Sequence, residues 1–243
     1  MTAETFSKNH LLLSLVPLDS PALPRQQELF TELASLGETA ATKTVAATAN
    51  SLAFRMGPHR AAVALAPTPI PWPRLEGPCE TAWWWPAAVA KLRGHGSHLL
   101  VALRGESDDD VARAIALTRL TAAAATQVDA AGVFWGGGSL VHDPLVFIEE
   151  ARKSIAEKLP LHLWIDFRIE GNDDGTYRLF TTGMKALGQM EIEIPHSRHE
   201  PRELFDFAGR YGRTPIKPLE LVTAKLAKLL QLAGCFNTFG DDF

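Results

Sequence analysis

The sequence predicts an α+β protein, a two-layer sandwich in which helices pack on a mostly antiparallel sheet. Two observations carry this prediction: short apolar runs of strand length, and segments between them whose apolar residues recur at helical spacing. A third is that the 243 residues are 46% hydrophobic and 21% charged, which is typical of a globular chain with a sizeable core.

The order of elements in the first part of the chain predicts a ferredoxin-like βαββαβ pattern. Helices are expected between Pro24 and Gly37 and from about Pro78 to Arg93. A proline-rich extended segment, residues 66–73, is expected between these two helices. Strands are expected where short apolar runs end at proline or glycine, at residues 11–16, 51–56, 60–65 and 99–103.

The second half continues with further helices and strands. Asp143 followed by Pro144 predicts the start of a helix. The clearest strand pattern covers residues 161–170, where every odd position is apolar. No low-complexity linker interrupts the chain. We therefore expect one α+β domain over residues 10–208, a disordered N-terminus (1–9) and a C-terminal tail (209–243).

Charge and cysteine content exclude several classes of protein. The net charge of −4 and the absence of a basic stripe argue against a nucleic-acid partner. The two cysteines, Cys79 and Cys235, have no metal-ligand spacing, so neither a metal nor a cofactor is expected. Lone cysteines fit a reducing compartment, and no run reaches the ~20 apolar residues of a membrane helix. The sequence thus predicts a cytoplasmic protein without a membrane partner, and leaves its oligomeric state open.

Three stretches of the chain resemble a known family. They are PIPWPRLEGPCETAWWWP at 69–86, GVFWGGGSLVH at 132–142 and LFTTGMKALGQMEIEI at 179–194, and the last is the most specific. In this order they resemble the bacterial family called domain of unknown function 4261, over about residues 10–208. The resemblance implies an uncharacterised bacterial protein and no particular activity, cofactor or catalytic residue. After Ala208 the chain departs from the family pattern, so the tail is expected to be divergent.

The run Trp83-Trp84-Trp85 lies within the predicted helix 78–93. Consecutive helical side chains are about 100° apart, so three tryptophans cannot all face one core. One interpretation is a binding surface that includes Trp72, Trp83 and Trp84, because exposed tryptophan is common in binding sites. The alternative is a core run whose outer ring is covered by the proline-rich segment.

Cys79 and His142 are the candidate catalytic residues of an alternative, hydrolase-type interpretation. Cys79 lies near the predicted helix start, where the helix dipole favours a thiolate. A nucleophilic thiol needs a base, and His142, His95 or His98 can supply one if the fold brings it close. The competing interpretation is a buried, inert cysteine.

Two glycine-containing loops are candidate binding elements. Trp135 ends a strand predicted over residues 132–135, and Gly136-Gly137-Gly138 follow it. Backbone amides in such a context can bind a phosphate, although the lysine of a P-loop is absent. Thr182-Gly183 begins a short turn whose amides can hold an anion or a partner's carboxylate. For both loops the alternative is a purely structural turn.

The missing catalytic constellation and the aromatic and glycine loops favour a non-catalytic protein-interaction or binding domain. Its partner is then another protein. The alternatives are the hydrolase with a Cys79/His142 site and a sensor of a small ligand.

Overall fold

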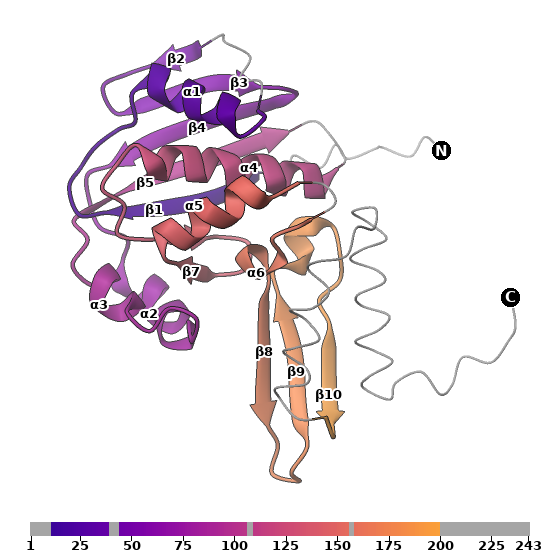
Figure 1. The fold of residues 1–243 in the computed structure, drawn as a ribbon. Helices are drawn as coiled ribbons and strands as arrows, with labels where there is room; N and C mark the ends of the chain where they lie inside the picture. The colour runs from indigo at the N-terminus through magenta and orange to yellow at the C-terminus, as the bar shows by residue number, and fades with distance from the viewer. Residues whose placement is uncertain (1–10, 39–43, 106–108, 156–157, 200–243) are drawn as a thin grey trace, which may run out of the picture.

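The computed structural model describes residues 11–38, 44–105, 109–155 and 158–199, and Figure 1 shows how they are arranged. A seven-stranded sheet carries helices, and a three-stranded sheet extends from one end of it. All strand pairs of both sheets are antiparallel. The predicted α+β class with an antiparallel sheet is therefore confirmed. The predictions for residues 1–9 and 209–243 lie outside the described residues.

The strands of the large sheet run in the order β2-β3-β4-β5-β1-β6-β7. The four strands predicted in the first part of the chain are all present, as β1, β3, β4 and β5. β2 was not predicted, because its side chains are mostly exposed and show no apolar alternation. The strands are β1 Leu11–Leu18, β2 Thr44–Ala47, β3 Ser51–Met56, β4 His59–Ala66, β5 Ser97–Gly105, β6 Val133–Trp135 and β7 Leu140–His142.

The ferredoxin-like pattern is not shown by this strand order. In a ferredoxin-like sheet the first strand of the pattern lies between the third and the fourth and is antiparallel to both, whereas here β5 separates β1 from β4. Here β1 pairs with β5 and β6, and β3, β4 and β5 form a meander. The sequence gives the order of elements along the chain, whereas the pairing of β1 depends on contacts between distant segments.

Three helices cover one face of the large sheet: α1 (Gln26–Ser35), α4 (Asp110–Thr126) and α5 (Pro144–Lys153) (Figure 1). α4 lies between the other two and is buried along most of its length, and its alanines permit this close packing. The hydroxyls of Ser14 on β1 and Thr121 on α4 are 2.6 Å apart and fix the helix on the sheet. As predicted, Asp143 caps α5.

Two short helices, α2 (Trp72–Thr81) and α3 (Ala88–Leu92), cover the opposite face at the β1-β6-β7 end. Leu15, Phe134 and Val141 are cross-strand neighbours on that face and pack against these helices. Helices therefore lie on both faces here, so the two-layer description holds only for the rest of the sheet.

The single helix predicted from Pro78 to Arg93 is wrong. The chain is helical to Thr81, passes through turns at residues 83–87 and becomes helical again at Ala88. Pro86 is unfavourable for one continuous helix here, because a proline disfavours helical geometry in the residue before it and cannot donate a backbone hydrogen bond. The start of α2 at Trp72 is also earlier than expected, and Pro73 lies in its first turn.

The small sheet has the order β10-β9-β8, with β8 Asp166–Gly171, β9 Tyr177–Thr182 and β10 Glu193–Ser197. The strand predicted over 161–170 is partly wrong, because Leu161–Trp164 forms a helical turn, α6, after Pro160. Trp164 occupies an even, supposedly exposed position, yet it is buried and its indole N–H donates to the Thr118 hydroxyl at 2.8 Å. A short 3₁₀ helix, η1 (Met184–Leu187), connects β9 to β10.

Candidate functional site

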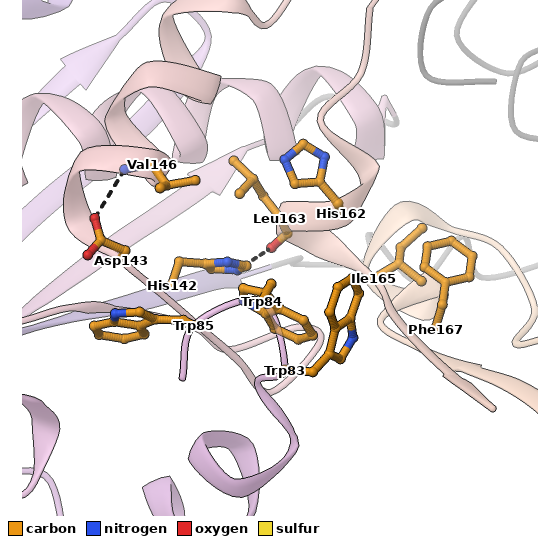
Figure 2. Close-up of a pocket in the computed structure, with 10 residues that line it drawn as sticks. All are labelled: Trp83, Trp84, Trp85, His142, Asp143, Val146, His162, Leu163, Ile165 and Phe167. Atoms are coloured by element: carbon orange, nitrogen blue, oxygen red, sulfur yellow. Dashed lines mark hydrogen bonds between the residues drawn. The ribbon is translucent and has the colours of Figure 1, made fainter. Parts of the chain in front are cut away.

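A pocket lined by tryptophan lies where three parts of the chain meet: the turn between α2 and α3, the start of α5, and the junction of α6 with β8 (Figure 2). Its volume is about 230 Å³. We call it the tryptophan pocket. Its lining is Trp83, Trp84, Trp85, His142, Asp143, Val146, His162, Leu163, Ile165 and Phe167.

The three consecutive tryptophans have different environments because they lie in a turn. Trp85 is buried in the cluster that joins α2 and α3 to the sheet. Trp84 is half-buried, and its indole N–H donates to the carbonyl oxygen of Val141 at 3.0 Å, which fixes the ring. Trp83 is 64% exposed and meets Trp84 edge-to-face, with ring centroids 5.7 Å apart and planes at 85°. Trp85 thus matches the core interpretation of this run, whereas most of the Trp83 side chain is exposed at the surface.

His142 is buried beside Trp84, with the two rings stacked at 6.1 Å. Its Nε2 lies 3.2 Å from the carbonyl oxygen of Leu163. A carbonyl only accepts, so Nε2 carries the proton and Nδ1 does not. Burial lowers the pKa of His142 to about 3; His162 also lowers it, and the bond to Leu163 partly opposes the shift. The imidazole is therefore neutral at physiological pH.

Cys79 and His142 do not form a catalytic pair. Cys79 lies in the last turn of α2, not at a helix start, and is only 5% exposed. Burial, with a contribution from Glu80, raises the pKa of its thiol to about 11. It packs in the same cluster as Val141, whereas His142, the next residue of β7, contacts Phe147 on the other face of the sheet.

The other two candidate bases, His95 and His98, are hydrogen-bonded to the backbone. His95 accepts a hydrogen bond from the backbone N–H of Ile70 at 2.8 Å through Nε2, and its Nδ1 donates to the carbonyl oxygen of Leu92 at 2.5 Å. Nδ1 of His98 lies 2.8 Å from the carbonyl oxygen of Thr68. These bonds fix the proline-rich segment and the end of α3, which is a structural role.

The first glycine loop, Gly136–Gly138, is part of the hairpin turn between β6 and β7 and does not lead directly into a helix. A Cβ atom on Gly136 would lie 2.8 Å from the carbonyl oxygen of Leu13, and one on Gly138 would lie 2.5 Å from that of Trp164. Trp135 is buried and stacks on Trp164 with centroids 6.4 Å apart. The geometry therefore matches the structural interpretation, in which glycine allows close backbone approach.

The second loop, Thr182-Gly183, already holds an anion that belongs to the chain. Oε1 of Glu191 accepts from the backbone N–H groups of Gly183 and Lys185 at 3.0 and 3.2 Å. Oε2 accepts from the N–H of Met184 at 3.2 Å and from the Thr181 hydroxyl at 2.9 Å. Amides at this turn do bind a carboxylate, as the sequence suggested, but the carboxylate is intramolecular.

The structure therefore separates the residues that the sequence indicated. Trp83, Trp84 and His142 meet in the tryptophan pocket. Trp72 lies outside it: its N–H donates to Glu76 at 2.9 Å, and the Arg93 guanidinium lies 4.7 Å above its ring. Sequence reasoning missed the sides of the pocket that α5 and the α6–β8 junction form. Their side chains resemble ordinary core residues in the sequence: Val146, Leu163, Ile165 and Phe167.

Within the described ranges, no group of three or more His, Cys, Asp or Glu side chains is placed to hold a metal ion. Among the helices of those same ranges, none has the length and apolarity to cross a membrane. No protein-family model, no curated protein and no solved structure matches the chain.

Proposed function

We propose that the chain is a non-catalytic binding protein that uses the tryptophan pocket to bind another protein. The observation that carries this proposal is the exposed Trp83 at an apolar pocket. Burying the exposed part of an indole of roughly 200 Å², at about 25 cal/mol per Å², contributes about 3 kcal/mol. An exposed tryptophan of this kind is the typical anchor of an interface.

The start of α5 enlarges the apolar surface at the pocket. Val146, which lines the pocket, is 50% exposed, and its neighbour Leu145 is 77% exposed. The Asp143 cap holds this turn by accepting from both of their N–H groups. Apolar side chains that gather on a surface, with a pocket among them, favour a partner that covers them.

The hydrolase alternative has less support. It requires a thiolate close to a base, whereas the thiol of Cys79 is buried and its pKa is raised. His142 is neutral and faces the other side of the sheet. The resemblance to the bacterial family of unknown function and a cytoplasmic location remain parts of the proposal, and neither adds a reaction.

The test is an affinity capture from a bacterial lysate followed by a quantitative binding measurement with each captured protein. Trp83→Ala and Val146→Ala each remove part of the proposed surface, and Val45→Ala, an exposed valine on β2, is the matched control. We expect a partner whose Kd rises at least about tenfold with the first two variants and is unchanged with the control. If every partner binds all variants equally, the pocket is not the binding surface.

A further inference from the structure

Resting on the proposed binding function, we infer that the tryptophan pocket takes an alkylated ammonium group, such as a quaternary amine. The group is apolar on its surface and carries one positive charge. Aromatic walls and one carboxylate match both properties.

Aromatic rings form most of the pocket. Of the ten described residues that line it, six carry one: Trp83, Trp84, Trp85, His142, His162 and Phe167. Trp83 and Trp84 contact each other edge-to-face with their planes at 85°, so their two indole rings form a corner at the pocket (Figure 2). The face of an aromatic ring carries negative potential, and indole attracts a cation more strongly than the other rings do.

The charge of the lining is negative. Among the lining residues that the structure describes, Asp143 supplies the one carboxylate, and none is a lysine or an arginine. Both cap bonds, from the N–H groups of Leu145 at 2.9 Å and Val146 at 3.3 Å, are accepted by Oδ1, and Oδ2 accepts neither of them. A cation therefore meets a counter-charge here, whereas an anion would be repelled.

The two histidines add no positive charge at neutral pH. His142 is neutral because burial lowers its pKa to about 3. Burial also lowers the pKa of His162; Glu150 opposes this shift, and Lys153 and Lys158 add to it. These three charged side chains lie around His162 outside the lining, and they are of both signs.

An alkylated nitrogen fits better than a bare ammonium. A bare ammonium must place three N–H donors, and an apolar lining offers few acceptors for them. The N–H of Trp84 and the Nε2–H of His142 are themselves donors and already serve the carbonyl oxygens of Val141 and Leu163. A cavity of about 230 Å³ is smaller than the ~300–1,000 Å³ of typical small-molecule pockets, so it suits a headgroup or the end of a side chain.

The test uses two probes of equal shape that differ in charge. Choline and its neutral carbon isostere, 3,3-dimethylbutan-1-ol, are titrated into the full chain, with tryptophan fluorescence and calorimetry as readouts. We expect choline to bind at least about fivefold more tightly, from its attraction to the rings and to Asp143. Equal or tighter binding of the alcohol, or no binding of choline, overturns the inference.

Two variants test the residues. Asp143→Asn keeps a good helix cap and should lose most of the preference for choline, whereas Glu76→Gln, a carboxylate outside the pocket, should retain it. Trp83→Leu keeps apolar area but removes a ring, and should weaken choline more than the alcohol. Unchanged preference in both pocket variants contradicts the inference even if choline binds.

The outcomes separate this inference from the proposed function. If the alcohol binds as well as choline, the pocket is an apolar binding site without charge preference. If neither probe binds but a partner protein depends on Trp83, only the ammonium inference fails. A third probe, N-acetyl-trimethyllysine methylamide, distinguishes a modified side chain of a partner, which it should match better than choline does, from a free amine.

Discussion

Replacing Glu191 with alanine tests how the loop between β9 and β10 is held. The carboxylate accepts four hydrogen bonds, from the backbone N–H groups of Gly183, Met184 and Lys185 and from the Thr181 hydroxyl. A bond to a charged group contributes about 1.5–3 kcal/mol, but the four share one carboxylate and part of the loop is reached by water. We therefore expect Glu191→Ala to lower the free energy of unfolding by about 2–4 kcal/mol in urea denaturation.

Glu193→Ala is the matched control, two residues away on β10. Glu193 bonds Arg178 at 2.7 and 2.9 Å, but its side chain is 56% exposed, so its loss should cost less than about 1 kcal/mol. Equal losses in the two variants would refute the reasoning, because the loop would then be held by its glycines and by Met184 and Leu187 in the core and not by the carboxylate.

Three further predictions follow from buried groups. Trp164→Phe should cost about 1–3 kcal/mol in chemical denaturation, because it leaves the Thr118 hydroxyl without the indole N–H in a buried site, whereas Trp83→Leu should change stability by no more than ~0.5 kcal/mol. Cys79 should resist alkylation at pH 8 in the folded protein and react rapidly in urea, since its pKa is about 11; fast labelling of the native thiol would contradict its burial. His142 has a pKa of about 3 when folded and about 6.5 when unfolded, so the unfolded state alone gains its proton as pH falls between these values. As pH falls through this range, the free energy of unfolding of the natural chain should therefore decrease more steeply than that of His142→Phe, by up to about 1.4 kcal/mol per pH unit. Parallel pH profiles of the two proteins would show that the histidine is not buried as neutral imidazole.

The strands were the most predictable part of the fold. β1, β3, β4 and β5 are apolar runs bounded by turn residues, so local sequence is sufficient to indicate them. β2 pairs only at its β3 side and is mostly exposed, so hydrophobic patterning gives no signal for it. The predicted helix breaks at Ala82, and Pro86 was a local signal against continuing it that the apolar spacing concealed.

The site was predictable only in part for a related reason. The tryptophan run and His142 were notable as residue types, whereas Leu163 and Ile165 are ordinary apolar residues in a segment read as a strand. Their place in the pocket depends on the order β1-β6-β7 and on the helical turn α6, which are long-range features. For the backbone amides at Gly183, the sequence indicated that they can bind an anion but not which one. Nothing local indicates that Glu191, eight positions later, supplies the carboxylate.

The α6–β8 side of the pocket is held by contacts from four separate parts of the chain. The carbonyl oxygen of Leu163 accepts from His142 of β7, while that of Trp164 lies against Gly138 of the β6–β7 turn and Gly183 of the β9–β10 loop. The Trp164 side chain is fixed on α4 by Thr118. Leu163 and Ile165 flank Trp164 in the chain and line the pocket, so fixing this residue positions both of them. Because this wall is held by the fold itself, binding does not require its ordering, and the more exposed lining residues, Trp83 and Val146, are the ones whose side chains a ligand would have to order.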